Sequence, residues 1–305
     1  DLRRVPLSGI DFSGYDVVKT LFHSGFENLV KRGGGQHPFI ICKLGSVVGS
    51  RDMEGIYFSG ESRVKRFKQQ QQMARTARYV TVLSGPAVDL WKSDVCSDSR
   101  LLLVPGAVDR EIPPPGKNPF HDVAEKRCIF SGNIYGHSSQ PQAHSVLASK
   151  LNDLGRHLQR LGVRLYFQGI GETKSLDASV VTYMGSASYD ESWQALQFAD
   201  VGIVVSAGPF MHNNESTKIY HYLRAGLPVV SESGFPNDHV VTSSGLGFLV
   251  ENEDMEEMAE RVAEAASAVW DRNGAIEYIL DHHTWDRRAA VYDKVLRDEL
   301  ANPGH

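Results

Sequence analysis

The chain has 305 residues, a formal net charge of −5 and 41% hydrophobic residues, a composition typical of soluble globular proteins. It lacks the ~20-residue apolar run of a membrane-spanning helix, and DLRRVPLSGIDFSG at its start does not resemble a signal peptide. The acidic balance argues against a nucleic-acid partner. Three widely spaced cysteines, Cys42, Cys96 and Cys128, indicate free thiols in a reducing compartment. We therefore expect a cytoplasmic protein of two domains.

In the first half, short apolar segments alternate with amphipathic ones, as in βαβ units around a parallel sheet. Strands are expected at 15–22, 38–44, 79–84 and 101–106. A helix after the first strand ends at Gly33-Gly34-Gly35, and others are expected at 61–77 and 88–92. Residues 110–120 then contain four prolines and a glycine, which suit neither a helix nor a central strand. This predicts a first domain at 1–109 and a linker at 110–122.

The second half repeats the same alternation. Strands are expected at 127–131, 163–168, 180–184, 200–206, 227–232 and 247–250. A long helix at 255–270 follows, with Asp254 as its N-cap, and a last helix begins at Trp285. We expect a second Rossmann-like domain at 123–284 and a closing helix with its tail at 285–305.

The segment HNNESTKIYHYLRAGLPVVSES, residues 212–233, has the pattern of a loop, a helix and a buried strand. Asn214 is the expected N-cap, and Gly226 and Pro228 end the helix. Its N-terminus would lie at the carboxyl edge of the sheet, where open α/β sheets bind ligands. Free amides and the helix dipole there, with Lys218, would attract an anion such as a diphosphate. The alternative is an ordinary capped helix with a solvated lysine.

The stretch ESTKIYHYLRAGLPVV resembles the donor-binding segment of GT-B glycosyltransferases. Five further stretches resemble family segments in the same order: LLLVPGAVD (101–109), CIFSGNIYG (128–136), LYFQGIGE (165–172), VTYMGSASYDESWQALQFADVGIVVS (181–206) and HHTWDRRAAVYDKVL (282–296). The resemblance covers about residues 15–300. It implies an α/β fold of two Rossmann-like domains facing each other across a cleft, the first of them short.

The resemblance also implies a function, that of a hexosyltransferase. A sugar would pass from a nucleotide-diphosphate donor, a UDP-sugar being favoured, to a glycan, lipid-linked or small-molecule acceptor. Polysaccharide biosynthesis is the expected setting. GT-B enzymes generally need no divalent ion, so no metal or cofactor is expected. The donor-binding candidates are Gly132, Asn133, Tyr183, Met184, Asn213, Glu215, Ser216, Thr217, Lys218 and His221.

Among these, Lys218 would bind the donor phosphates, together with backbone or hydroxyl groups of Gly132, Ser216 and Thr217. Tyr183 and Met184 would contact the base through backbone atoms. Glu215 has two interpretations, an acid that complements the helix dipole or a contact to the hydroxyls of the donor sugar.

Several positions depart from the family pattern. Asn213 and His221 stand where retaining members have two glutamates, and Asn133 replaces the usual arginine. Both replacements at the glutamate positions can hydrogen-bond hydroxyl groups. The combination is more similar to the branch typified by the xanthan glucuronosyltransferase, whose members invert configuration, so an inverting course is favoured.

Inversion needs a general base for the acceptor hydroxyl. His23 is the candidate, with Asp52, Glu54 and Glu61 behind it; the alternative for His23 is a capping or surface histidine. Lys43-Leu44-Gly45 stands where many relatives have a His-Gly pair. Only 14 residues precede the first strand, which indicates either a compact variant or a chain that lacks its beginning.

The run RVKRFK places Arg63, Lys65, Arg66 and Lys68 on one predicted helix. It suggests peripheral membrane contact for a lipid-linked acceptor, against the alternative of a solvated helix face.

Two other functions stay open. A nucleotide-sugar 2-epimerase uses a similar double Rossmann fold, but the missing glutamates at Asn213 and His221 count against it. A non-catalytic sugar-nucleotide-binding subunit would fit the short first domain.

Overall fold

The computed structural model describes residues 9–49, 60–120, 126–134, 136, 140–208 and 213–301. The chain forms two compact units, Asp1–Pro105 and Gly106–His305. Each has its own parallel sheet and its own apolar core.

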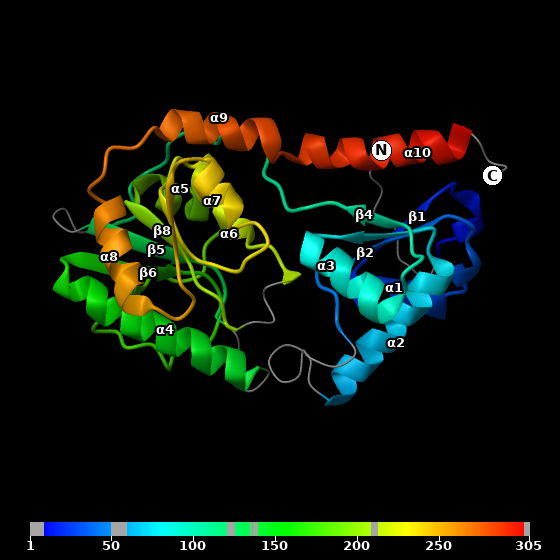
Figure 1. Cartoon of the computed structure of the whole chain (residues 1–305), viewed down its shortest axis with the longest axis horizontal. Coiled ribbons are helices and arrows are strands. Elements are labelled where there is room, and N and C mark those ends of the chain that lie inside the picture. The colour runs from blue at the N-terminus through cyan, green and yellow to red at the C-terminus, as the bar shows by residue number, and fades with distance from the viewer. Residues whose placement is uncertain are drawn as a thin grey trace. The chain divides into compact units, whose positions relative to one another are not determined.

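The sheet of the first unit has the strand order β1-β2-β3-β4 (Figure 1). Its core includes Phe26, Ile40, Met73 and Trp91, which are fully buried. The strands are β1 (Val18–Leu21), β2 (Ile40–Lys43), β3 (Tyr79–Val82) and β4 (Leu101–Leu103). The helices are α1 (Phe22–Lys31), α2 (Gly60–Thr76) and α3 (Gly85–Leu90), with short helical turns at Phe12–Gly14, Gly34–Gln36 and Trp91–Val95.

The sheet of the second unit has the order β10-β9-β8-β5-β6-β7, with every pair parallel. The strands are β5 (Lys126–Ser131), β6 (Val163–Gln168), β7 (Val181–Tyr183), β8 (Val201–Val204), β9 (Val229–Glu232) and β10 (Gly247–Val250). The helices are α4 (Pro141–Arg160), α5 (Tyr189–Phe198), α6 (Thr217–Arg224), α7 (His239–Ser243), α8 (Met255–Ala265), α9 (Arg272–His282) and α10 (Trp285–Ala301).

Helices cover both faces of this second sheet. α4 and α8 pack against each other on one face, and α6 packs against α9 on the other (Figure 1). The core beneath α5, α6 and α9 joins Ile129 and Tyr166 of the sheet to Leu196, Ile219 and Ile279 of the helices. Burial on both faces explains why the strands are short runs of apolar residues without a polar alternation.

All ten predicted strands are confirmed in the predicted order, with differences at their ends. The strand expected at 15–22 ends at Leu21, because Phe22 has a left-handed φ of 59° and begins α1. Such a φ is an outlier for a bulky residue. The helix expected at 255–270 ends at Ala265, and a separate helix, α9, follows. Asp271 caps it by accepting a hydrogen bond from the Gly274 N–H.

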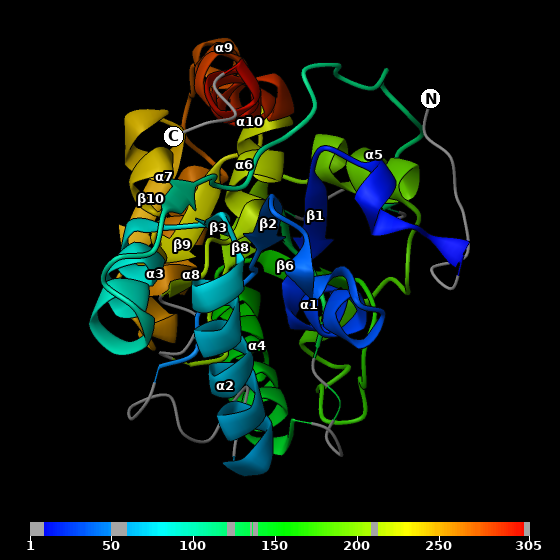
Figure 2. The same cartoon turned by 90° about the vertical axis from the view of Figure 1, so that its right-hand side faces the viewer.

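The proline-rich segment expected as a linker is part of the second unit and runs past α6 and α5 (Figure 2). The Arg224 guanidinium donates to the carbonyl of Glu111. The Trp193 indole donates to the carbonyl of Pro113 over 3.3 Å, and the Gly116 N–H donates to Gln197 Oε1 over 3.3 Å. These contacts hold the segment on the helices, so the units divide at Pro105/Gly106, before the prolines.

None of the helices in the described ranges is both long and apolar enough to cross a membrane.

Candidate functional site

The strand order of the second unit contains one reversal that positions a site. From β5 the chain continues outward through β6 and β7, whereas β8, β9 and β10 follow on the other side of β5. In an open parallel sheet, the carboxyl ends of the strands beside such a switch point form the usual ligand-binding crevice. Here those strands are β5, which is followed by Gly132, and β8, whose connection leads into α6 and Lys218.

Lys218 lies directly over Gly132. A Cβ atom added to Gly132 would come within 2.5 Å of Lys218 Cε and 3.2 Å of Nζ. The ammonium also lies 5.1 Å from the centre of the Phe130 ring, near the end of β5. Two residues that the sequence assigned to one ligand thus meet at the switch point, although 86 positions separate them. Sequence reasoning missed Phe130, which reads there as an ordinary strand residue.

Among the residues that the structure describes, no carboxylate forms an ion pair with Lys218. The side chain is half-buried, and burial lowers the pKa of its ammonium to about 8. A partly buried cation without a counter-ion is costly. An anion bound beside Gly132 would remove that cost.

The N-terminus of α6 differs in detail from the predicted cap. The N-cap is Ser216 rather than Asn214, and its hydroxyl does not cap the helix. Asn237 accepts a hydrogen bond from the Ser216 N–H over 2.9 Å and donates to its carbonyl over 3.0 Å. The Ser216 amide is therefore occupied, and Thr217, which is exposed, begins the helix. Asn237 has no recognisable sequence signal, because it lies 21 residues from its partner.

Ser216 also has a buried hydroxyl. The residue is 5% exposed, and within the described ranges its Oγ has no hydrogen-bond partner. Since polar groups of buried side chains are normally paired, this hydroxyl is available to a group that binds at the end of α6.

Glu215 is engaged within its own unit. One carboxylate oxygen accepts the Gly106 N–H over 2.5 Å, and the other accepts the Tyr220 hydroxyl over 2.9 Å. Arg288 holds the other side of the same peptide, donating to the Gly106 carbonyl over 3.0 and 3.2 Å. Burial raises the pKa of Glu215, while the Gly106 N–H, the Tyr220 hydroxyl and Arg288 act to lower it. The sequence analysis predicted none of these contacts of Glu215.

Asn213 and His221 stand at the positions where the family has glutamates. Asn213 is buried at 7% exposure. His221 is half-buried, with its ring edge-on to Tyr189 at 6.3 Å between centroids. Burial and the nearby Arg224 lower the pKa of the imidazole, while Asp109 acts to raise it. A neutral imidazole can both donate to and accept from a hydroxyl group.

The loops after β5 and β6 touch through glycines. A Cβ atom at Gly169, where φ is 151°, would lie 1.6 Å from the Gly132 carbonyl oxygen. At Gly171, where φ is 145°, it would lie 2.1 Å from that of Ile134. Only glycine fits so close an approach of two backbones. The motif Gly-Ile-Gly is therefore what brings the β6 loop against Gly132.

Tyr183 and Met184 lie at the end of β7. The Tyr183 hydroxyl donates to the Gly169 carbonyl over 3.0 Å, and its ring stacks on Phe167 at 5.1 Å. The Met184 N–H donates to the Phe167 carbonyl over 2.8 Å, so this amide is used by the sheet. Asn133, which follows Gly132, is exposed. The contacts of Tyr183, Gly169, Gly132 and Lys218 make these four residues one continuous group.

His23 lies in the packing between α1 and α2. It is 4% exposed, and its Nε2 atom lies 3.2 Å from Gln70 Oε1. The amide of Gln70 also accepts from the Val48 N–H and donates to the Val48 carbonyl, which fixes its orientation. Because Oε1 only accepts, Nε2 carries the proton, and burial lowers the pKa of His23 to about 4. This environment gives no support to a role as general base.

The other acceptor-side residues are less informative. Glu61 is exposed at the start of α2, and Asp52 and Glu54 lie outside the described residues. In the basic run, Lys65 pairs with Glu27 at 3.1 Å, Arg63 and Arg66 are half-buried, and Lys68 is exposed. In the part of the chain that the structure describes, no cluster of three His, Cys, Asp or Glu residues suits a metal ion.

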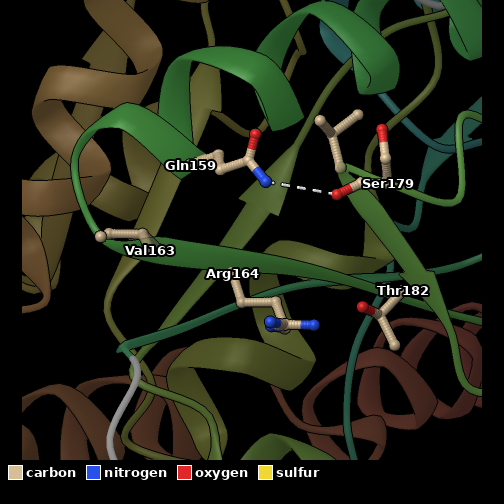
Figure 3. Close-up of a pocket in the computed structure, with 7 residues that line it drawn as sticks. Gln159, Val163, Arg164, Ser179 and Thr182 are labelled. Atoms are coloured by element: carbon tan, nitrogen blue, oxygen red, sulfur yellow. Dashed lines mark hydrogen bonds between the residues drawn. The ribbon is translucent and has the colours of Figure 1, made fainter.

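A small hollow of about 80 Å³ lies at the opposite edge of the second sheet, near the amino end of β6 (Figure 3). Gln159 closes one side by donating to the Ser179 carbonyl over 3.4 Å. Since β6 and β7 begin here and end near Gly132, this hollow is separate from the site around Lys218.

Comparison with known proteins gave a family match within the second unit and structural matches over most of the chain. Residues 147–273 match the family "Glucosyltransferase 3-like, C-terminal domain", a stretch that includes Lys218 and His221. The whole chain superposes on sucrose-phosphate synthase from Thermosynechococcus elongatus with a TM-score of 0.72 and 14% identity, covering 94% of this chain and 74% of that one. The chain therefore has the GT-B fold, and residues 147–273 of its second unit match a glucosyltransferase domain family.

Two further glycosyltransferase structures share the fold. The pneumococcal O-GlcNAc transferase GtfA gives a TM-score of 0.63 at 11% identity, with 92% of this chain and 57% of GtfA covered. WaaG, a glycosyltransferase involved in lipopolysaccharide biosynthesis, gives 0.61 at 14%, with 90% and 82% covered. The chain therefore spans a little over half the length of GtfA. No curated protein sequence matches the chain, and the predicted kinship with the xanthan branch stays a prediction.

Proposed function

We propose that this protein is a glycosyltransferase that moves a sugar from a nucleoside-diphosphate donor, with UDP favoured as the nucleotide, to a glycan, lipid-linked or small-molecule acceptor. One observation carries the proposal. Lys218 presents a half-buried ammonium over Gly132, without a carboxylate partner in the described ranges, at the switch point of the second sheet. A diphosphate bound at this point would interact both with the Lys218 ammonium and with the N-terminal end of α6.

The proposed chemistry follows from the leaving group. Breaking the bond between the anomeric carbon and the diphosphate leaves negative charge on the phosphate oxygens. Positioned donors that stabilise developing charge are a major source of catalysis. Lys218 supplies a full charge at neutral pH, because its pKa of about 8 lies above 7. The residues around it thus offer a way to stabilise the diphosphate without a metal ion, which is the mode we propose.

The nucleotide is proposed from the relatives. The GtfA structure holds UDP and GlcNAc, and the similarity of fold makes UDP the first candidate here. Tyr183, Met184 and Asn133, beside the Gly169 loop, are the proposed neighbours of the base, and Asn213 and His221 the proposed contacts of donor hydroxyls. Ser216 and Thr217 are proposed to supply hydroxyl groups to the phosphates.

An inverting course is part of the proposal. Asn213 and His221 leave both glutamate positions of the retaining pattern without a carboxylate. A single displacement would then use a base on the acceptor side, and His23 is no longer our candidate for it. The anomeric configuration of the product, followed by proton NMR, decides between the two courses.

A cytoplasmic location with peripheral membrane contact through Arg63, Lys65, Arg66 and Lys68 is also proposed. Lys65 is paired with Glu27 and Arg63 donates to the Gly49 carbonyl over 3.5 Å, whereas Lys68 is exposed. Co-sedimentation with phosphatidylglycerol vesicles, compared with phosphatidylcholine vesicles, tests it. Equal binding to both would contradict an electrostatic contact.

The donor site is tested by a thermal-shift screen of the whole chain against UDP, GDP, ADP and dTDP, each with and without EDTA. We expect UDP to raise the melting temperature and EDTA to leave that rise unchanged. Stabilisation by another nucleotide would reassign the base. Loss of the shift with EDTA would contradict metal independence, and no shift with any nucleotide would contradict the donor site.

A further inference from the structure

A buried ion pair joins α4 to the carboxyl end of β9. The Lys150 ammonium donates to Glu232 Oε1 over 2.7 Å, and the two residues are 7% and 0% exposed. Lys150 also donates to Asn252 Oδ1 over 3.1 Å. Charges are seldom buried in this way unless their hydrogen-bonding groups are satisfied. The site described above uses neither residue.

Glu232 also accepts hydrogen bonds from two backbone amides, which lie just beyond the ends of the neighbouring strands. Its Oε2 accepts the Ser206 N–H over 2.5 Å, and its Oε1 accepts the Glu253 N–H over 3.0 Å. Ser206 lies two residues beyond β8, and Glu253 three residues beyond β10. The Ser206 hydroxyl also donates to Asn252 Oδ1 over 3.4 Å. One carboxylate therefore ties together the carboxyl ends of β8, β9 and β10.

The tie to Ser206 bears on the donor site because the connection from β8 to α6 begins there. At its other end, Asn237 holds both the N–H and the carbonyl of Ser216. Asn237 lies only five residues after Glu232. Both ends of the connection are thus held from one short segment, which runs from the last residue of β9 to Asn237. Lys218 lies in the first turn of α6, two residues after Ser216.

We propose that Lys150 and Glu232 are positioning residues for the diphosphate of the donor. By fixing the carboxyl end of β9, the ion pair holds the short segment that leads to Asn237, and Asn237 in turn sets where α6 begins and where the Lys218 ammonium lies over Gly132. The inference rests on the function proposed above.

Glu232 accepts from three donors, and the Lys150 ammonium is the charged one among them, so we expect its charge to hold the carboxylate in place. An apolar pair of similar volume would fill the space, as replacements of buried ion pairs often do. It would leave the Ser206 and Glu253 amides without a partner.

The test compares three variants of the whole chain with the wild type. In Lys150→Met/Glu232→Leu the pair becomes apolar, in Lys150→Arg the charge is kept, and Lys126→Met removes a lysine that donates to the Ala266 carbonyl near the start of β5. We expect the double variant to fold and to bind UDP at least tenfold more weakly by calorimetry. Lys150→Arg should stay within about threefold of the wild type, and Lys126→Met should match it.

A second readout does not depend on the nucleotide. Amide hydrogen exchange, followed by mass spectrometry, should rise in the double variant for peptides covering 204–208 and 213–218, and stay unchanged in β5 and β6. A folded double variant with wild-type UDP affinity, or with unchanged exchange in those peptides, would overturn the inference. Failure of the wild type to bind UDP would contradict only the choice of UDP in the proposed function, since exchange still decides whether the pair positions the segment.

Should the double variant not fold, Lys150→Gln decides the matter. It keeps a hydrogen-bond donor toward Glu232 and loses the charge, so the same tenfold loss of UDP affinity and the same local rise in exchange are expected. Wild-type affinity in folded Lys150→Gln would overturn the inference.

Discussion

Lys218 is the residue on which the proposed donor site depends most. Its ammonium lies over Gly132 and 5.1 Å from the centre of the Phe130 ring. In Lys218→Met the stem is kept and the charge is lost, so we expect UDP affinity to fall at least tenfold while the fold is retained. Titration calorimetry measures the affinity. Lys174→Met, which removes an exposed lysine of the same unit, is the control, and equal affinities of the two variants would refute a phosphate role.

The same residue predicts a pH dependence. Because burial lowers the pKa of Lys218 to about 8, the free protein loses this charge as the pH rises past 8. The phosphates of UDP are fully ionised by then, since their second pKa is about 6. UDP affinity should therefore weaken between pH 7.5 and 9.5, and the decline should vanish in Lys218→Arg, whose guanidinium stays charged. A pH-independent affinity of the wild type would contradict the prediction.

The contribution of Lys218 to the free energy of unfolding should change with pH in the opposite direction to UDP affinity. Between about pH 8 and the ordinary lysine pKa near 10.5, the unfolded chain holds a proton on this side chain that the folded protein lacks. The contribution of this group to stability therefore rises with pH in that range. A loss of UDP affinity at higher pH would therefore not be explained by destabilisation of the fold through Lys218.

Two glycines of the site should behave differently when replaced by alanine. At Gly132 the new methyl group clashes with the flexible end of Lys218 and touches Phe130 Cζ at 3.4 Å, so Gly132→Ala should fold normally and bind UDP about tenfold more weakly. At Gly169 it meets the backbone carbonyl of Gly132, at a φ of 151°, so Gly169→Ala should be destabilised by several kcal/mol. Urea unfolding and UDP calorimetry separate the two effects. A stable Gly169→Ala would contradict the close packing of the two loops.

At the scale of elements, one glutamine joins α2 to the segment after β2. Gln70 is fully buried and bonds both backbone groups of Val48 as well as His23. Gln70→Leu would leave these groups unpaired, which we expect to cost about 2–4 kcal/mol in the free energy of unfolding. Urea unfolding measures it, and Gln71→Leu on the same helix should change stability by less than about 0.5 kcal/mol. Equal effects would mean that the buried contacts contribute little.

The elements themselves were largely predictable, and their exact ends were not. Buried parallel strands are apolar runs between turn residues, so sequence patterns locate them well. The N-cap of α6 is Ser216 instead of Asn214 because Asn237 holds the Ser216 backbone. α1 begins at Phe22 through a left-handed backbone angle. Such ends depend on partners far away in the chain, which a local pattern does not contain.

The whole molecule has two units with separate cores. Such units can unfold in separate steps, so calorimetry should resolve two transitions. A ligand stabilises only what it binds, so UDP should raise the midpoint of the transition that belongs to Gly106–His305 and leave the other near its original temperature. Hydrogen exchange during heating assigns each transition to its unit. One transition that shifts as a whole with UDP would contradict independent unfolding.

The sequence by itself determined the alternation of strands and helices, the two Rossmann-like units and the segment that carries Lys218, because these follow from local composition and spacing. Only the tertiary structure decided which segments meet. The strand reversal at β5 brings Gly132 beneath Lys218, and Glu215 bonds Gly106, 109 positions away. The tertiary structure also places His23 against Gln70 in a buried contact. Pairings of this kind are set by the packing of distant elements, and the physical reason is that apolar burial, which drives that packing, is not directional.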